Sequence, residues 1–120
     1  CALPIYLLFD RLKTDNSDFL GSWLKNKNKE PNWHWWTSHN IDMKNRECFG
    51  SYFPIIRLSS KACYTLKNIY ENNKELDGFC EVLVPSILNR EHMKLKDILD
   101  VSGYIRIMHK EEDLLRYGLK

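Results

Sequence analysis

A helical pattern of apolar residues opens the chain. Within residues 6–13, four apolar side chains follow the spacing of one face of a short helix: Tyr6, Leu8, Phe9 and Leu12. The turn-forming residues 14–17 end this helix. Residues 18–24 then have the composition of a short strand, in which Gly21 leaves room for a close neighbour. The polar stretch 25–31 is predicted to be a loop.

A second strand and a helix are predicted in the middle of the chain. Residues 49–58 are rich in aromatic and β-branched side chains, and the unbroken apolar run 53–56 indicates a strand buried on both faces. Pro54 has no N–H to donate to a sheet, so we expect it at an edge or a bulge. Ser59 or Ser60 caps the following helix. Five apolar side chains fall at helical spacing behind this cap: Ala62, Cys63, Leu66, Ile69 and Tyr70.

The pattern is less regular in the last part of the chain. The helix ends in the polar residues 71–74, and residues 79–88 fit either a strand or a helix. Pro85 is compatible with a helix only near its first turn. Residues 94–98 are predicted to be a connector and 104–108 a last strand before a charged tail. Because helix and strand signals alternate, the predicted class is α/β.

Composition and charge narrow the class of protein. The chain has 120 residues, 43% hydrophobic and 28% charged, as in one ordinary globular domain. The net charge of +2, with basic and acidic residues interspersed, argues against a nucleic-acid-binding protein. The apolar runs are far shorter than the ~20 residues that cross a bilayer, so no transmembrane segment is predicted. The 4 cysteines contain no CxxC pair and are expected to be reduced thiols in a cytoplasmic protein.

The first residues, 1–5, are expected to be non-native. They contain no Met and read as the translated end of a common sequencing adapter. We therefore predict that the natural protein continues upstream, and that residues 1–120 are a single domain fragment truncated at its amino end. A processed chain is the alternative that the sequence leaves open.

Three tryptophans leave the polar loop together, at Trp33, Trp35 and Trp36. Indole rings stack on the apolar face of a pyranose, so these residues are candidates for binding a sugar. The alternative is that the tryptophans anchor the loop in the core. We expect this for Trp35, whereas the sequence does not decide between the two interpretations for Trp33 and Trp36. Stacking on nucleic-acid bases is a third option, but no basic groove accompanies it.

Other common chemistries are not indicated. Four possible metal ligands are close in sequence: His34, His39, Asp42 and Cys48. They lack the spacing of a zinc site, so no metal is predicted in this chain. Cys63 lies on the apolar face of the predicted helix and is expected to be an inert core thiol. The 5 glycines are scattered, so a nucleotide diphosphate would be held by residues outside this chain.

Glu81 is the acid whose position best suits catalysis. It follows the Gly78-Phe79-Cys80 segment and precedes an apolar stretch, where a helix start can aim its carboxylate at a cleft. A partly buried carboxylate there can act as a general base toward a sugar hydroxyl. The alternative, which the pattern alone favours, is an acid that satisfies free amides and the helix dipole.

Several segments, in their order along the chain, resemble motifs of a bacterial glycosyltransferase-like family. They are the tryptophan-rich EPNWHWW at 30–36, FPIIRLS at 53–59, GFCEVLVPS at 78–86 and MKLKDI at 93–98. The resemblance covers residues 15–98, most of the chain. That family is similar in turn to GT-A glycosyltransferases of the core-2 branching type.

This resemblance implies a partial GT-A-like, Rossmann-like sheet with flanking helices that forms the acceptor side of a transferase. It gives Glu81 the role of catalytic base in an inverting transfer, and it places Arg57 or Ser59 near the donor phosphates or the acceptor. The implied partners are a nucleotide sugar and a glycan. The family's donor-binding strands and acidic motif, which would hold the donor and any divalent metal, are not in this sequence. We therefore expect the isolated chain to be inactive.

A non-catalytic module is the rival interpretation. Such a module would use the tryptophan loop to bind a carbohydrate or another protein. This interpretation predicts that the chain binds sugars but not nucleotides. It does not require an upstream part that binds a nucleotide-sugar donor. Because one fold serves many functions, fold analogy does not decide between the two.

Overall fold

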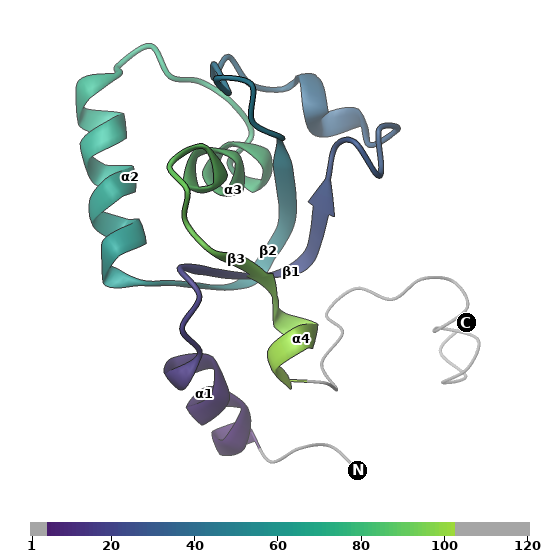
Figure 1. Ribbon diagram of the computed structural model, residues 1–120, viewed down its shortest axis with the longest axis vertical. Helices are drawn as coiled ribbons and strands as arrows, with labels where there is room; N and C mark the ends of the chain where they lie inside the picture. Colours follow the sequence, from purple (N-terminus) through teal and green to yellow (C-terminus); the bar gives the residue numbers. More distant parts are fainter. Residues whose placement is uncertain (1–4, 103–120) are drawn as a thin grey trace.

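A computed structural model describes residues 5–102 of the chain (Figure 1). Residues 1–4 of the segment expected to be non-native, and the strand predicted at 104–108, lie outside this range. The elements are α1 (Ile5–Thr14), β1 (Phe19–Asn26), the 3-10 turn η1 (His34–Thr37), β2 (Phe49–Leu58), α2 (Ser60–Asn72), α3 (Cys80–Arg90), β3 (Leu95–Asp97) and α4 (Ile98–Ser102).

The strand β1 is the centre of a three-stranded mixed sheet of order β2-β1-β3. β2 pairs with β1 antiparallel and β3 pairs with it parallel. The predicted α/β class is confirmed, while the relation to the GT-A fold stays a prediction. The connector predicted at 94–98 is wrong in part, because Leu95–Asp97 forms β3 against Phe19–Gly21. β1 also runs to Asn26, into the loop predicted at 25–31, since its last residues pair with the start of β2.

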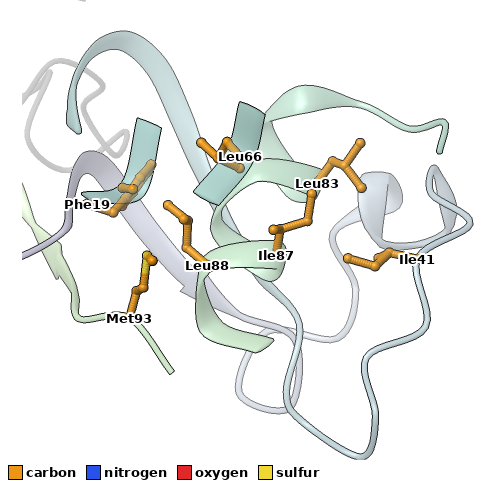
Figure 2. Packing of buried hydrophobic residues seen from close by; sticks show 8 residues of the cluster. Phe19, Ile41, Leu66, Leu83, Ile87, Leu88 and Met93 are labelled. Atoms are coloured by element: carbon orange, nitrogen blue, oxygen red, sulfur yellow. The ribbon is translucent and has the colours of Figure 1, made fainter. Parts of the chain in front are cut away.

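The two faces of the sheet carry separate apolar clusters. Successive strand residues point to opposite faces, and Phe19 and Leu20 of β1 are both fully buried. Leu20 packs with Leu12 of α1 and Ile98 of α4. Phe19 belongs to the main core beneath α2 and α3 (Figure 2). The buried residues of that core are Phe19, Ile41, Ala62, Leu66, Leu83, Ile87, Leu88 and Met93. Figure 1 accordingly shows α2 and α3 on one side of the sheet and α1 and α4 on the other.

The helix predicted behind Ser59 is confirmed as α2. The Ser59 hydroxyl accepts a hydrogen bond from the N–H of Ala62 at 3.0 Å, which is the bond expected of an N-cap. Ala62 and Leu66 are buried, but Cys63 is exposed. The prediction of a core thiol at Cys63 is therefore wrong, because this residue lies a further ~100° round the helix from Ala62 and outside the buried stripe.

The helix predicted at 6–13 is confirmed as α1, with a narrower buried face than expected. Leu12 is buried, whereas Phe9 is 58% exposed. The side chains of Tyr6 and Leu8 lie outside the described part of the chain. α1 packs chiefly against the short helix α4.

The ambiguous segment at 79–88 is helical and forms most of α3. Pro85 lies in the second turn of this helix, not near the first as expected, and its missing N–H leaves the Glu81 carbonyl without its helical partner. Proline inside a helix costs about 3 kcal/mol, whereas each fully buried aliphatic side chain contributes about 1.5–3 kcal/mol. Four such side chains lie in α3 and outweigh that cost: Val82, Leu83, Ile87 and Leu88.

The predicted strand at 49–58 is confirmed as β2, but its predicted burial on both faces is wrong. Pro54 is exposed and Ile55 is 42% exposed, because β2 is an edge strand. The register slips between Gly21 and Ser22 of β1, which leaves residues 53–55 without partners in β1. Pro54 therefore lies in an irregular part of an edge strand, as expected for a residue that cannot donate to a ladder.

Gly21 of β1 has no room for a side chain. A Cβ at this position would contact the hydroxyl oxygen of Ser51 and would lie 2.6 Å from ring carbons of Phe19. Ser51 is itself fixed, because its hydroxyl donates to the main-chain oxygen of Ser22 at 2.7 Å. The close neighbour predicted for Gly21 is confirmed, and no side chain fits there without a shift of the sheet.

Candidate functional site

Trp33 and Trp36 form one aromatic pair around η1. The ring centroids are 4.8 Å apart and the rings meet edge to face. Both rings lie against Gly50 of β2, where a Cβ would contact them. Trp36 is only 3% exposed, and its indole N–H donates to the main-chain oxygen of Glu30 at 2.7 Å. Trp36 therefore anchors the loop in the core.

Trp35 lies apart from this pair and is 38% exposed. The prediction that Trp35 is the core residue of the three is therefore wrong. The reason is the 3-10 turn: residues three apart lie above one another, so Trp33 and Trp36 share a side and Trp35 faces elsewhere. Of the three tryptophans, Trp35 is the most exposed.

The Trp35 ring stacks on Phe79, with centroids 4.4 Å apart and an interplanar angle of 30°. Phe79 is the N-cap residue of α3 and precedes Glu81 by two positions. Its N–H donates to the main-chain oxygen of Ser38 at 3.0 Å, which ties the loop after η1 to the start of α3. The fold thus places an accessible indole beside the helix start that carries the candidate base.

Glu81 lies in the first turn of α3 and is half-buried. Its Oε1 accepts a hydrogen bond from the N–H of Phe53 at 3.1 Å. Phe53 belongs to the part of β2 that has no partner in β1, so this carboxylate satisfies an otherwise free strand amide. Within residues 5–102, the second carboxylate oxygen has no hydrogen-bond partner. The carboxylate is thus held by one oxygen and can offer the other.

A second α3 side chain bonds to the same strand. The hydroxyl of Ser86 donates to the main-chain oxygen of Phe49 at 2.9 Å and accepts from the Phe49 N–H at 3.0 Å. Together, Glu81 and Ser86 attach α3 along the irregular strand β2. Glu81 therefore has a structural function, whatever chemistry it carries.

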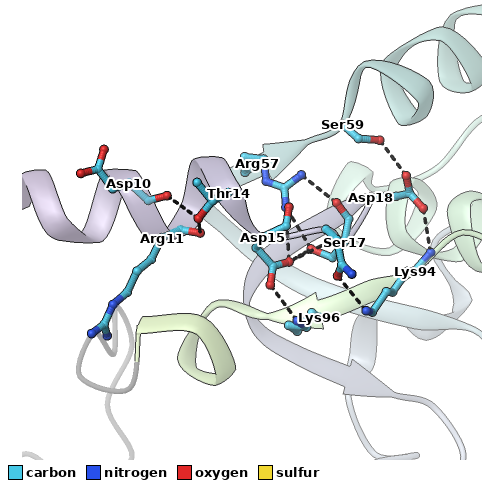
Figure 3. Close-up of polar contacts among 11 residues, drawn as sticks. Asp10, Arg11, Thr14, Asp15, Ser17, Asp18, Arg57, Ser59, Lys94 and Lys96 are labelled. Atoms are coloured by element: carbon cyan, nitrogen blue, oxygen red, sulfur yellow. Dashed lines mark hydrogen bonds and ion pairs between the residues drawn. The ribbon is translucent and has the colours of Figure 1, made fainter.

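Arg57 and Ser59 lie at the other end of β2 from Trp33 and Trp36, which pack against Gly50. Figure 3 shows the polar contacts of Arg57 and Ser59. The Arg57 guanidinium donates to the main-chain oxygens of Ser17 at 2.7 Å and Asp15 at 3.0 Å. The Ser59 hydroxyl donates to Asp18 Oδ1 at 2.8 Å. The structure does not bring these two residues together with the tryptophans or Glu81. Their contacts instead fasten the turn between α1 and β1 to the end of β2.

Asp15 is the centre of this network. Its Oδ2 accepts from the Lys96 ammonium at 2.7 Å, and its Oδ1 accepts from the Ser17 N–H at 2.9 Å and lies 3.5 Å from the Arg57 guanidinium. Burial by itself would raise the pKa of Asp15, but the hydrogen bonds from Lys96 and Ser17 outweigh burial and hold that pKa well below its usual range. The side chain is 11% exposed, so little water screens these contacts.

We expect the network to make the fold sensitive to acid. The pKa of Asp18 is also lowered, chiefly by the hydrogen bond from the main-chain N–H of Lys94. Asp15 and Asp18 thus both have a pKa below the usual range of a carboxyl group. A carboxyl whose pKa is lower in the folded than in the unfolded state stabilises the fold above the unfolded value of about 4, and this contribution is lost as pH falls toward the folded value. Urea unfolding at a series of pH values should therefore show stability falling below about pH 4.

Asp15→Asn tests the source of this dependence. At neutral pH it should destabilise the fold by roughly 2–4 kcal/mol, because two cations lose their partner, and it should flatten the acid slope. Glu71→Gln is the control. The Lys67–Glu71 pair on α2 is more than half exposed, so its loss should cost less than about 0.5 kcal/mol. An Asp15→Asn protein with the wild-type acid slope would contradict this assignment.

His39 and Cys48 form the other notable polar pair. The Nε2 of His39 lies 3.7 Å from the Cys48 sulfur, and its Nδ1 accepts from the N–H of Ile41 at 3.3 Å. Because Nδ1 accepts a hydrogen bond, we assign the ring proton to Nε2. A histidine that binds a metal through Nε2 would need that nitrogen to be unprotonated. Burial, and then the charge of Lys27, lower the pKa of His39, and burial raises that of Cys48. Among the described residues, no three His, Cys, Asp or Glu side chains converge on one point.

Sequence reasoning gives no role to Phe79 or Lys25, although both belong to the aromatic region. The Lys25 ammonium lies 4.2 Å from the Trp23 ring centroid and 5.7 Å from that of Trp33. An aromatic residue two positions before the candidate base was a usable signal for Phe79. Lys25 gave none, because its place depends on Trp23, which adopts a positive φ of 55° at an irregularity of β1.

Comparison of the chain with protein-family models, with curated proteins and with solved structures found no match. None of the helices within residues 5–102 has both the length and the apolar content to cross a bilayer. The geometry above and the sequence motifs are therefore the basis for assigning a function.

Proposed function

We propose that this chain is the acceptor side of an inverting glycosyltransferase, with Glu81 as the general base. The observation that carries the proposal is that the amino end of α3 carries both the Trp35–Phe79 stack and Glu81. A half-buried carboxylate with one oxygen available lies two residues from an aromatic platform of the kind that packs on a pyranose. The resemblance of the surrounding motifs to a glycosyltransferase-like family supports the same role.

In this mechanism, Trp35 supports the acceptor sugar while one acceptor hydroxyl donates a hydrogen bond to the second oxygen of Glu81. The Phe53 N–H holds the first oxygen and fixes the orientation of the carboxylate. As the hydroxyl oxygen attacks the anomeric carbon of the nucleotide sugar, its proton passes to Glu81. The bond from the anomeric carbon to the diphosphate oxygen breaks on the opposite side, so the configuration inverts and a nucleoside diphosphate leaves.

We assign the donor to sequence outside these 120 residues. The glycines are scattered along the sequence, without the spacing of a phosphate-binding loop, and the described residues contain no cluster of metal ligands. Arg57 and Ser59 enter the proposal as positioning residues that fix the end of β2, and contact with the donor phosphates stays a prediction. Cys48, Cys63 and Cys80 are free thiols, which supports the cytoplasmic location included in the proposal.

Titration with nucleotide sugars tests the split donor site. Thermal unfolding would be followed for this chain and for a longer polypeptide that includes the predicted upstream part. We expect the longer polypeptide to be stabilised, by about 1.4 kcal/mol at a ligand concentration near ten times Kd, and this chain to be unaffected. If neither protein responds to any nucleotide sugar, the transferase proposal is contradicted.

A carbohydrate-binding or protein-interaction module is the second candidate, favoured by the exposure of Trp35. An accessible ring stacked on a second ring can hold a sugar without any catalysis. This candidate predicts that sugars bind with no nucleotide present, and that replacing Glu81 by Gln leaves their affinity unchanged. The transferase proposal predicts loss of turnover in that variant.

A further inference from the structure

A hollow lies between the end of α2 and the end of α3. Its volume is about 620 Å³, within the ~300–1,000 Å³ range of small-molecule sites. The walls come from residues 40–42, from residues 69 and 72–76, and from Arg90. Neither Trp35 nor Glu81 belongs to this lining. The hollow is therefore separate from the candidate active site.

The walls of this hollow are cross-linked. The Asn40 side chain donates to the main-chain oxygen of Glu75 at 2.6 Å and accepts from the N–H of Asp77 at 2.8 Å. On the opposite side, the Arg90 guanidinium donates to the main-chain oxygen of Asp42 at 3.2 Å. Because the segments are joined before any ligand enters, binding costs little ordering of the walls.

The floor of the hollow is apolar. Ile41 is a buried member of the main core, and Ile69 and Leu76 pack against the same core. All three line the hollow. A ligand that settles on this floor must present an apolar surface of its own, such as the C–H face of a sugar ring.

The rim of the hollow is polar and carries no net charge. Two acids and two bases line it: Asp42, Glu75, Lys74 and Arg90. Two asparagines add acceptors. The amide nitrogen of Asn72 donates to the Asn68 main-chain oxygen and that of Asn73 to the Ile69 main-chain oxygen, both at 2.8 Å, which leaves the two amide oxygens as acceptors. The rim thus offers acceptors and donors side by side.

We infer that this hollow binds a neutral saccharide. Sugar hydroxyls donate to carboxylates and amide oxygens and accept from guanidinium and ammonium groups, while the ring's C–H face packs on the aliphatic floor. The balanced charge of the lining gives no net attraction for a phosphate or a polyamine. The inference rests on this lining and does not depend on Glu81 or on the proposed transfer reaction.

The test is an NMR titration of the 15N-labelled chain with three neutral disaccharides: maltose, lactose and cellobiose. Amide shifts should change at residues 40–42 and 72–76. The variant Glu75→Ala should bind about tenfold more weakly, because a carboxylate–hydroxyl bond is lost. Asn40 bonds to the main chain of Glu75, so this variant keeps the wall intact. Trp35→Ala is the matched control and should leave binding in the hollow unchanged.

The outcomes separate this inference from the proposed function. Shifts that cluster at the hollow and weaken in Glu75→Ala but not in Trp35→Ala support it. Shifts confined to Trp35, Phe79 and their neighbours would overturn it and leave the acceptor platform supported. An absence of shifts with all three disaccharides would also overturn it. Shifts at the hollow with inorganic phosphate or glycine, and none with the disaccharides, would overturn the ligand class.

Discussion

Replacing Glu81 by Gln should abolish sugar transfer by the longer polypeptide while leaving its fold intact. The Gln amide oxygen can still accept the hydrogen bond from the Phe53 N–H, so the α3–β2 contact is kept. An amide cannot take up the acceptor's proton, and loss of a general base lowers rates by about 10²–10⁴-fold. Initial rates with a nucleotide sugar and a glycan acceptor, measured beside urea unfolding, would show both effects.

Two further variants separate chemistry from stability at this helix. Glu81→Ala should lose transfer and also about 1–3 kcal/mol of stability, because the Phe53 N–H is left without its partner. Ser86→Ala breaks the other α3–β2 bonds, at Phe49, but keeps the carboxylate, so it should lose stability and retain transfer. Turnover at the wild-type rate in Glu81→Gln would remove Glu81 from catalysis and leave only its structural function.

Replacing Trp36 by Ala should destabilise the protein by about 3–5 kcal/mol, the usual cost of emptying a large buried aromatic site. Trp36 is 3% exposed, packs with Trp33 against Gly50 and donates to Glu30. Urea unfolding at neutral pH would measure the loss. The same experiment on Trp35→Ala should show a loss of less than about 1.5 kcal/mol, because Trp35 is far more exposed than Trp36 and its ring contacts are with His34 and Phe79 at the surface of the loop.

The two tryptophan variants should differ in the opposite sense in binding. Trp35→Ala should weaken the affinity for an acceptor sugar, while Trp36→Ala should change it only through the loss of stability. A Trp35→Ala protein that is less stable than Trp36→Ala would contradict the assignment of Trp36 to the core. Unchanged sugar affinity in Trp35→Ala would remove the platform from the proposed mechanism.

The sequence predicted the elements that their own residues mark. The apolar positions of α2 and its Ser59 cap, and the β-branched and aromatic run of β2, marked these elements without knowledge of their neighbours. β3 was not predictable in this way. Its three residues form a strand only because β1, far away in the sequence, supplies a partner. The place of Pro85 in the second turn of α3 was not predictable for a similar reason. The burial of this helix against the core outweighs the local cost of a proline in a helix.

The candidate site was predictable in part. Glu81 and the tryptophans could be singled out from residue type and motif, but their environments could not. The bond from the Phe53 N–H to Glu81 depends on a slip in strand register, and the reversed places of Trp35 and Trp36 depend on a 3-10 turn. Neither the register slip nor the 3-10 turn produces a periodic pattern of apolar residues in the sequence. The sequence predicts Asp15 only as a turn former. Its role as the centre of a polar network could not be predicted, because its partners Arg57 and Lys96 lie far along the chain.

The position of β1 between two distant partners also determines when this sheet can be completed during synthesis. β1 leaves the ribosome before both of its partners; β2 can pair with it next, but the other edge of β1 stays unpaired until Asp97 emerges and pairs with Gly21. Ile98, which covers Leu20 on that face, emerges immediately afterwards. A nascent chain that stops short of these residues keeps an open strand edge and an uncovered leucine, the features that promote aggregation and proteolysis. We therefore expect the pairing of β3 to make this sheet less susceptible to aggregation and proteolysis.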